Sequence, residues 1–402
     1  MLVFLLIPFY LIFNWYLARW LLRWMGACVH LFQTQGAKWL VLAVYWFISL
    51  SPLISYLVPQ GRIHRMMRLL ANQWMGTLEY ILLVVLVLDG IRHVYKHTKW
   101  GKRELKHPRR TLAAWGRVAV ALVMGISIWG IIQAGELKVN RVEVQIQKEA
   151  PALEQESLTV ALVADLHLGY TIGLDHTRQV VEQLKLADPD LVVFAGDTFD
   201  NEYAALEDPQ ALAEMLREIP SRYGVYSCWG NHDVTERLLA GFSLGGEISS
   251  QEDEKFREFF QQAGIQLLED QAVLVEDAFY LVGRQDPQRQ AKLGEGRLDP
   301  DQLLEGLDQD KPILVIDHQP GQLEELSQAG ADLVLSGHTH NGQMFPGNLV
   351  VKLFWENPAG VMQVGNMTSC VTQGAGVWGP AMRVGTQNEI MLITVEFAGA
   401  EK

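Results

Sequence analysis

The segment LVVFAGDTFD, residues Leu191–Asp200, decides the fold. Five consecutive apolar residues, Leu191–Ala195, end at a short polar motif, here called a polar word, with the sequence Gly196-Asp197-Thr198-Phe199-Asp200. A short continuous apolar run of this kind suits a strand that is buried on both faces of a sheet. Carboxylates placed directly after such a strand lie at the carboxyl edge of the sheet, where α/β proteins bind ligands. The segment therefore predicts an α/β fold with a polar site at the strand ends.

Four more polar words follow apolar runs in the same way. They are Asp165-Leu166-His167, Gly230-Asn231-His232-Asp233, Asp317-His318 and Gly337-His338-Thr339-His340. Each word by itself is compatible with an ordinary turn or helix cap. Because five such words recur in order, separated by segments long enough for crossover helices, we expect their side chains to share one site.

The residue types of these words point to a metal centre. Oxygen and imidazole ligands suit divalent ions such as Mn²⁺ or Fe²⁺, whereas a thiolate site would need cysteines that the words lack. Two ions roughly 3.5–4 Å apart can clamp a phosphoryl group and present a nucleophile for in-line attack. A carboxylate has to bridge the pair, and Asp197 on its tight Gly196 turn is the candidate. We expect two divalent ions, with Mn²⁺ as the first choice and Fe or Zn as alternatives.

The ordered words resemble the calcineurin-like metallophosphoesterase family, whose pattern is D-x-H, G-D-x-x-D, G-N-H-D/E, a separate His, and G-H-x-H. The match extends over about residues 157–396. The segments Leu335–Gln343, His318-Gln319-Pro320 and Gly379-Pro380 look like the branch of membrane-attached or exported bacterial enzymes. Asn341 stands where that branch more usually has glycine, which puts no ligand in doubt.

The resemblance implies a role for each matching residue. The first metal would be held by Asp165, His167 and His340 and the second by Asn231, His318 and His338, with Asp197 bridging both. His232 would lie beside the metals and donate a proton or positive charge to the leaving oxygen, since imidazole can donate a proton near neutral pH. Asp200 and Asp233 would orient histidine ligands. The alternative for these two carboxylates is a role in turns and caps.

The apolar and amphipathic segments predict the remaining elements. Strands are expected at about 139–146, 158–164, 191–195, 313–316 and 333–335, and helices at 176–187 and 209–219. Helical signals fade after residue 344, and strands at 361–364, 369–371 and 389–397 are expected to belong to a second sheet. The predicted fold is therefore an α/β metallophosphoesterase domain of two packed mixed β-sheets flanked by helices.

The first 135 residues have the composition of a membrane domain. Four stretches, about 1–24, 38–58, 75–94 and 112–134, approach the ~20 apolar residues that a bilayer core requires. Tryptophans gather near the ends of these stretches, as in an interfacial belt. We expect four transmembrane α-helices over 1–135, a linker and first strand over 136–157, and the catalytic domain over 158–402. A buried helical bundle of a soluble protein is the alternative.

Charge is divided unevenly along the 402 residues. The formal net charge is −13, but residues 1–135 carry 15 Lys+Arg against three acidic residues, which leaves −25 on residues 136–402. An acidic second part offers no basic stripe to neutralise phosphates, so nucleic acid is not expected as a ligand.

Basic residues also predict the orientation in the membrane. The third connection, Arg92–Arg110, is rich in Lys and Arg, and Arg19, Arg23 and Lys38 flank the first. The positive-inside rule places both connections in the cytoplasm. The catalytic domain of this integral protein of the cell or inner membrane would then be extracytoplasmic. Arg62–Arg68, before the third span, is expected in an interfacial turn or a solvated loop.

The predicted metal ligands indicate hydrolysis of a phosphoester or pyrophosphate, but they do not identify the substrate. Four spans exceed what tethering needs, and Met344–Trp355, directly after His340, is unusually apolar. Such a segment could enter the headgroup layer, which favours membrane lipids as partners and a lipid-linked substrate. A strand with a packed loop is the alternative for this segment. Glu236–Phe256 is expected to be an insertion that caps the site.

Two other functions stay open at this point. One is the same phosphoesterase chemistry on soluble phosphoesters, with the helices as an anchor only. The other is a membrane sensor or transporter whose soluble domain binds metal without turnover. Measured hydrolysis that depends on Asp197 and His232 would exclude the second of these.

Overall fold

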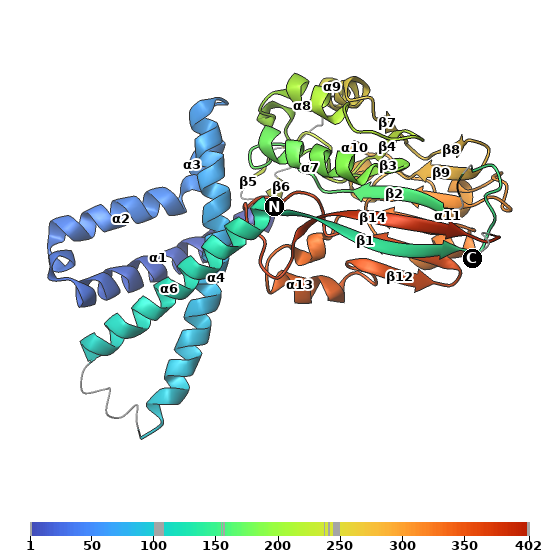
Figure 1. The fold of residues 1–402 in the computed structure, drawn as a ribbon. Helices are drawn as coiled ribbons and strands as arrows, with labels where there is room; N and C mark the ends of the chain where they lie inside the picture. The colour runs from blue at the N-terminus through green and yellow to red at the C-terminus, as the bar shows by residue number, and fades with distance from the viewer. Residues whose placement is uncertain are drawn as a thin grey trace. The chain divides into compact units, whose positions relative to one another are not determined.

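In a computed structural model the chain divides into two compact units (Figure 1). The structure describes residues 2–99, 108–153, 155, 157–236, 238–239, 242–243 and 250–399. The first unit comprises Met1–Ile131 with Arg237–Gly245 and Gly379–Met382, and the second comprises Ile132–Glu236, Gly246–Trp378 and Arg383–Lys402. The first unit is mainly helical, and the second combines helices with two large sheets.

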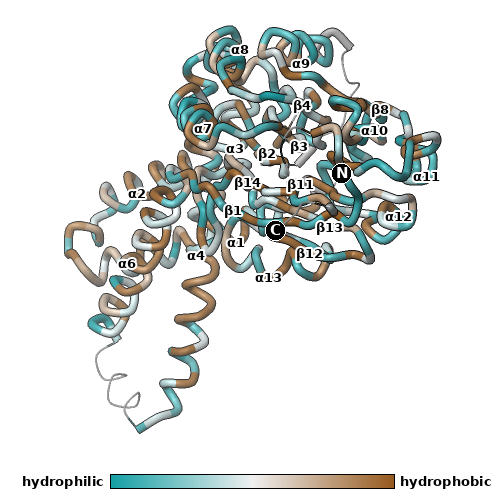
Figure 2. The backbone as a smooth tube through the Cα atoms, turned by 45° about the vertical axis from the view of Figure 1, so that its right-hand side comes forward, coloured by the Kyte–Doolittle hydropathy of each residue, from teal (hydrophilic) through white to brown (hydrophobic). Residues whose placement is uncertain are grey.

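Long apolar helices make up most of the first unit. They are α1 (Leu2–Cys28), α2 (Gln35–Ser49), α3 (Ser51–Leu57), α4 (Arg62–Lys96) and α6 (Pro108–Gly135), with the 3-10 turn η1 (His30–Gln33) between α1 and α2. Hydrophobic residues, brown in Figure 2, run along much of α4 and α6. Helices α1, α4 and α6 are long and apolar enough to cross a bilayer.

The predicted second span is bent. Helices α2 and α3 meet at an angle of 59°, and Pro52 lies in the first turn of α3. Proline has no backbone N–H and therefore cannot continue the hydrogen-bond ladder of α2. The described helices give four spans if the bent pair is one span, and three if it is not.

Helix α4 begins earlier than the apolar pattern predicted. The third apolar stretch starts near residue 75, but α4 starts at Arg62 and continues for 35 residues. Arg62–Arg68 therefore forms the first turns of a helix and not a loop. Hydropathy marks only the apolar part of a helix, and no proline or glycine in residues 62–75 would break the preceding turns.

Two six-stranded mixed sheets form the second unit. The first, in spatial order, is β1 (Leu137–Ile146), β14 (Asn388–Phe397), β2 (Ser157–Val163), β3 (Leu191–Ala195), β4 (Val225–Cys228) and β7 (Gln266–Leu267). The second is β12 (Gly360–Val364), β13 (Met367–Val371), β11 (Leu333–Ser336), β10 (Ile313–Ile316), β9 (Phe279–Gly283) and β8 (Gln271–Val275). Strands β2, β3 and β4 run parallel to one another, and so do β9, β10 and β11.

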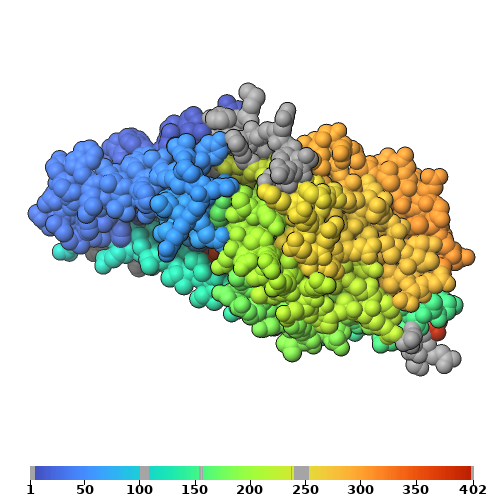
Figure 3. Space-filling model, turned by 90° about the horizontal axis from the view of Figure 1, so that it is seen from above, coloured from blue at the N-terminus to red at the C-terminus, as the bar shows by residue number. Residues whose placement is uncertain are grey.

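Both faces of the central strands β2 and β3 are buried, as their continuous apolar residues predicted. Val160 and Leu162 of β2 belong to the core between the two sheets, together with Leu314 of β10. Ala161 and Val163 belong to the core on the other face. Helices α7 (Leu174–Ala187), α8 (Pro209–Leu216) and α9 (Ser250–Gln262) contribute to that second core, and Figure 3 shows the face that α8 and α9 cover. The α/β architecture with two mixed sheets is therefore confirmed.

The segment predicted as a cap, Glu236–Phe256, lies partly outside the described residues. Within it, β5 (Leu238–Leu239) pairs antiparallel with β6 (Phe242–Ser243), and α9 begins at Ser250. Residues 237, 240–241 and 244–249 are not among those the structure describes. The expected cap over the site therefore stays a prediction.

Candidate metal centre

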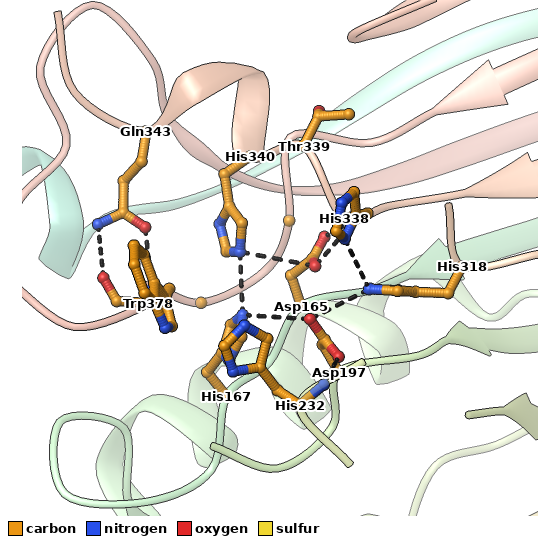
Figure 4. A network of polar contacts seen from close by, with 12 residues as sticks. Asp165, His167, Asp197, His232, His318, His338, Thr339, His340, Gln343 and Trp378 are labelled. Carbon is orange, nitrogen blue, oxygen red and sulfur yellow. Dashed lines mark hydrogen bonds and ion pairs between the residues drawn. The ribbon is translucent and has the colours of Figure 1, made fainter. Parts of the chain in front are cut away.

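The five polar words follow the carboxyl ends of β2, β3, β4, β10 and β11. Because β2, β3 and β4 are parallel neighbours, and β10 and β11 are parallel neighbours in the other sheet, the loops of each sheet lie together. Figure 4 shows the side chains of these loops converging on one place. The convergence expected from the sequence is therefore present.

The first cluster consists of Asp165, His167 and His340. One ligand atom of each lies within 4.8 Å of the others. The Nε2 atoms of His167 and His340 are 3.0 Å apart, and the latter is 3.5 Å from Asp165 Oδ1. All three residues are buried, so their polar atoms are shielded from bulk water.

The second cluster consists of Asp197, His318 and His338, whose ligand atoms also lie within 4.8 Å of one another. His318 Nε2 is 3.1 Å from Asp197 Oδ2 and 3.3 Å from His338 Nδ1. The amide oxygen of Asn231 is 3.2 Å from the same His318 nitrogen. Asn231 therefore faces this cluster.

Asp197 lies between the two clusters. Its Oδ2 atom is 3.8 Å from His167 Nε2 in the first cluster and 3.1 Å from His318 Nε2 in the second. The ring nitrogens of His167 and His340 face each other at 3.0 Å, and those of His318 and His338 at 3.3 Å. Protons alone can pair only part of the lone pairs on these nitrogens. The set of carboxylate, amide and imidazole donors around Asp197 fits divalent cations.

Five of the converging residues have a backbone conformation that L-amino acids rarely adopt. Their φ angles are 54° for Asp165, 51° for His167, 50° for Asp197, 72° for His338 and 49° for His340. Left-handed conformations cost on the order of 1–3 kcal/mol each and persist only where the surroundings enforce them. Here the amides of Asp165 and His167 donate to the carbonyl oxygens of Gly196 and Asp197, both at 3.0 Å. Five candidate ligands are therefore held in this conformation, which eight other non-glycine residues of the described chain share.

Glycine is required at two of the words because the chain passes close to a carboxylate. A Cβ atom at Gly230 would lie 2.1 Å from Asp197 Oδ1, and one at Gly337 would lie 2.5 Å from Asp165 Oδ2. Both positions exclude any side chain. The glycines of these words therefore let the following ligands, Asn231 and His338, approach the carboxylates.

The comparisons with known proteins agree with this geometry. Residues 158–342 match the family described as calcineurin-like phosphoesterase. This segment is a calcineurin-like metallophosphoesterase domain. The chain is therefore a metal-dependent phosphoesterase, and divalent ions are implied by its family as well as by its donor set.

Relatives of this metallophosphoesterase include membrane proteins. A bovine "Transmembrane protein with metallophosphoesterase domain" is 29% identical over 385 residues, which cover 93% of this chain and 82% of the relative. An "Uncharacterized metallophosphoesterase" of Aquifex aeolicus is 26% identical and covers 65% of this chain and 93% of its own length. "UDP-2,3-diacylglucosamine pyrophosphatase LpxG" of Chlamydia muridarum is 23% identical, and the match covers 52% of this chain and 70% of the relative. With the apolar helices, these relatives identify a membrane protein.

Protonation in the metallophosphoesterase site is governed by buried carboxylates. Burial raises the pKa of Asp165 to about 6, although the charge of His318 opposes the shift. Burial alone would also raise the pKa of Asp197, but the nearby histidines, His318 above all, hold it well below its usual value. The pKa of His318 is raised well above its usual value because Asp197 and Asp165 outweigh the effect of burial. In the absence of metal, His318 and Asp197 are therefore an ion pair.

His232 lies beside both clusters. Its backbone N–H donates to Asp197 Oδ1 at 2.7 Å, and its Nδ1 is hydrogen-bonded to the side-chain oxygen of Asn201. It also forms a third group of possible ligands with His167 and Asp200. Burial lowers the pKa of His232 to about 4, so the ring is neutral at pH 7 and would have to gain a proton before acting as an acid.

The two carboxylates predicted to orient histidines differ in their contacts. Asp200 Oδ1 is 3.7 Å from His167 Nδ1 and 4.0 Å from His232 Nδ1. The oxygens of Asp233 instead accept hydrogen bonds from the backbone amides of Phe199 and Gly230, at 2.8 and 2.7 Å. Asp233 therefore ties two of the loops together, and its role in orienting histidines stays a prediction.

Arg383 is a residue of the site that the sequence did not reveal. It is fully buried, and its guanidinium donates to the carbonyl oxygens of His340 at 3.1 Å, Gln373 at 2.7 Å and Gly376 at 2.6 Å. Its Nε donates to Asn388 Oδ1 at 2.7 Å. Burial lowers the pKa of Arg383 to about 10, so it stays charged and holds the loop that carries His340.

Two tryptophans beside the site were also not identified as site residues from the sequence. The ring of Trp378 is 5.8 Å from that of His232, and the ring of Trp355 is 5.2 Å from that of His338. Gln343 fixes Trp378 through two hydrogen bonds to its backbone, both 2.9 Å long (Figure 4). No spacing rule links these aromatic residues to the five words, so only the structure reveals them.

Proposed function

We propose that this chain uses two divalent ions to hydrolyse a phosphoester or pyrophosphate bond of a lipid-linked substrate at the membrane surface. We further propose four spans within residues 1–135, a linker and first strand over 136–157, and a catalytic domain over 158–402. The catalytic domain would lie outside the cytoplasm, attached to the cell or inner membrane. The oligomeric state is left open.

The proposed metal ligands are those implied by the family pattern. Asp165, His167 and His340 would hold one ion, Asn231, His318 and His338 the other, and Asp197 both, with Mn²⁺ as first choice and Fe or Zn as alternatives. Bound ions would polarise the phosphoryl group and supply the nucleophile. The Nδ1 atom of His318 is 2.8 Å from the carbonyl oxygen of Ala195, which orients Nε2 toward Asp197.

His232 is the proposed proton donor to the leaving oxygen. Its ring is half-buried at the edge of both clusters, and Asn201 fixes its orientation. The negative charge of a bound phosphate would favour the protonated ring. Asp200, 4.0 Å from Nδ1, would add to that effect.

The exposed apolar surface beside the site is the observation that carries the lipid assignment. Residues 347–353 form the single turns α13 (Gly347–Val350) and η4 (Val351–Leu353) and not the packed strand that the sequence left open. Leu353 is 81% exposed and Phe354 is 76% exposed. The next residue, Trp355, packs against His338. Apolar surface of this kind is typical of interaction with lipid or protein, and it begins directly at the proposed metal ligands.

The relatives support the same substrate class. One is named a UDP-2,3-diacylglucosamine pyrophosphatase, and others are named transmembrane proteins. A lipid-linked pyrophosphate would place its acyl chains on the apolar surface and its phosphates on the metals.

The test is a double substitution, Leu353→Ser with Phe354→Ser, in the full-length protein. We expect KM for a micellar lipid phosphoester to rise at least tenfold, while hydrolysis of p-nitrophenyl phosphate is unchanged. Leu186→Ser is the matched control because Leu186 of α7 is 79% exposed. If the double variant and the control changed KM for the lipid phosphoester equally, the lipid assignment would be refuted. The enzyme would then be a phosphoesterase for soluble esters.

The catalytic part of the proposal has its own test. Asp197→Ala should abolish hydrolysis of both substrates, because the shared carboxylate is lost. His232→Ala should lower kcat for esters with poor leaving groups more than for p-nitrophenyl phosphate, whose leaving oxygen needs little protonation. Full activity of Asp197→Ala would refute the two-metal assignment, whatever the result with lipid.

A further inference from the structure

A basic pocket in the first unit is separate from the metal centre and is not used by the proposed reaction. It has a volume of about 610 Å³ and opens among η1 and the ends of α1, α2 and α6. Four cationic side chains line it, Arg19, Arg23, Lys38 and Arg109, and its apolar wall includes Leu22 and Phe32. Cations from three different helices therefore surround one space.

The positive charges of this basic pocket are not balanced by protein carboxylates. Among the residues the structure describes, none of the four cations has a carboxylate oxygen within 4.0 Å. The guanidinium of Arg109 donates to the carbonyl oxygen of Gly26 at 3.0 Å, and Arg19 lies over the ring of Trp15 at 4.7 Å. Asp89 accepts a hydrogen bond from Tyr16 at 3.3 Å and lines a different, much smaller pocket. Within the part of the chain that the structure describes, the charge of the pocket is therefore left for an external anion to balance.

The apolar wall indicates which anion fits. The pocket lies at the ends of helices that are apolar enough to span a bilayer, so it is at the depth of lipid headgroups. A small soluble anion would balance the cations but leave the side chains of Leu22 and Phe32 in water. An amphiphile with a phosphate headgroup satisfies both parts, because its acyl chain covers the apolar wall.

We propose that this basic pocket binds the phosphate group of an anionic phospholipid as a bound, non-substrate lipid. Arg23, Arg109 and Lys38 contact the phosphate, and the start of an acyl chain lies along Leu22 and Phe32. The site does not depend on the substrate of the metal centre, since every lining residue belongs to the first unit.

The experiment uses the full-length protein in a neutral detergent with added phosphatidylglycerol or phosphatidylcholine. Bound lipid is counted by native mass spectrometry, and the melting temperature is measured in parallel. We expect phosphatidylglycerol to be retained and to raise the melting temperature, while phosphatidylcholine does neither. Arg23→Gln with Arg109→Gln should weaken phosphatidylglycerol binding at least tenfold.

Arg117→Gln is the matched control. Arg117 lies on α6 like Arg109, and its Nε donates to the Ala113 carbonyl oxygen at 3.1 Å, away from the pocket lining. This control should bind phosphatidylglycerol as the unaltered protein does. All variants should hydrolyse p-nitrophenyl phosphate at the unaltered rate, because none touches the metal centre.

Further arms separate the possible outcomes. Arg23→Lys with Arg109→Lys keeps the charges and should keep phosphatidylglycerol binding, which covers the case in which the glutamine variant does not fold. Unchanged binding in a folded glutamine variant, or loss of binding in a folded lysine variant, would overturn the proposal. Equal stabilisation by inorganic phosphate at the same concentration would make the pocket a site for a soluble anion and would also overturn it.

Discussion

Single residues at the metal centre are fixed through atoms that do not face the metals. The backbone N–H of His338 donates to both carboxylate oxygens of Asp165, at 3.0 and 2.9 Å. The carbonyl oxygen of His340 accepts from Arg383, and His318 Nδ1 is paired with a backbone carbonyl. The backbones of His338 and His340 and the ring of His318 are therefore held in place before any ion binds, which reduces the entropy that metal binding has to overcome.

Metal uptake should release a proton. Burial lowers the pKa of His318, but Asp197 and Asp165 outweigh it and raise the pKa well above its usual value. The metal-free protein therefore carries a proton on His318 at neutral pH, and this proton must leave before an ion binds there. We expect Mn²⁺ affinity to rise about tenfold per pH unit below that pKa, as one released proton requires. Calorimetry in two buffers with different ionisation enthalpies measures the proton, and equal heats would contradict the prediction.

Arg383→Lys should weaken metal binding more than it weakens the fold. Lysine keeps the charge but cannot donate to three carbonyl oxygens and Asn388 at once. Loss of a group that positions a ligand typically lowers metal affinity about 10- to 100-fold. We expect the Mn²⁺ concentration for half-maximal hydrolysis to rise by that factor, with activity restored at saturating Mn²⁺. Arg178→Lys, at an exposed ion pair with Asp175 on α7, should leave this concentration unchanged.

At the scale of elements, the loop after β4 rests on a buried tryptophan. Trp229 directly precedes Gly230, and its Nε1 donates to Glu269 at 2.8 Å. The guanidinium groups of Arg289 and Arg257 lie 4.2 and 5.3 Å from its ring, an arrangement that favours cation–π attraction. The position of the Asn231 and His232 loop is therefore linked to the segment that leads into β8.

Glu269→Gln should alter stability at acidic pH. Burial raises the pKa of Glu269, but hydrogen bonds from Arg257 and Trp229 outweigh it and lower the pKa below its usual value. A lowered folded-state pKa means that the stabilisation is complete above the unfolded pKa of about 4.3 and is lost as pH falls through the folded value. We expect the variant to melt earlier at pH 7 and to lose less on acidification to pH 3. Glu218→Gln, at an exposed pair with Lys185, is the control and should change little.

At the scale of the whole molecule, one residue separates the last membrane helix from the catalytic sheets. Helix α6 ends at Gly135 and β1 begins at Leu137. The side-chain amide of Asn388 donates to the carbonyl oxygen of Ala134 at 2.7 Å and accepts from Arg383. The end of α6 is therefore connected to the loop of His340 by two side chains. Chain continuity alone puts the second unit on the side of the membrane where α6 ends.

Reporter fusions should resolve the topology and the number of spans. We expect a reporter at residue 105 to lie in the cytoplasm and a C-terminal reporter to lie outside it, because the basic third connection stays inside. An N-terminal reporter separates the two span counts. Four spans place both termini on one side, whereas three spans, with the bent α2–α3 pair not crossing, place them on opposite sides. A cytoplasmic C-terminal reporter would refute the proposed orientation.

The elements that the sequence predicted correctly have strong local signals. The runs before Asp165, Asp197, Asp317 and Gly337 are strands because continuous apolar residues need burial on both faces. The errors lie where the signal is not local. Nothing in the composition of Arg62–Arg68 separates a polar helical turn from a loop, and the bend between α2 and α3 depends on where Pro52 falls within an otherwise uniform apolar stretch.

The sequence by itself determined the α/β class, the membrane helices and the residue types that gather at the strand ends. Hydrophobic periodicity and the residue types of a motif depend only on residues close together in the sequence. Only the tertiary structure decided which side chains support those ligands. Arg383, Asn201 and Trp355 are joined to the site by contacts between segments far apart in the chain. Arg383 and Asn201 are buried and Trp355 contacts the ring of His338; both kinds of contact depend on the packing of the whole domain.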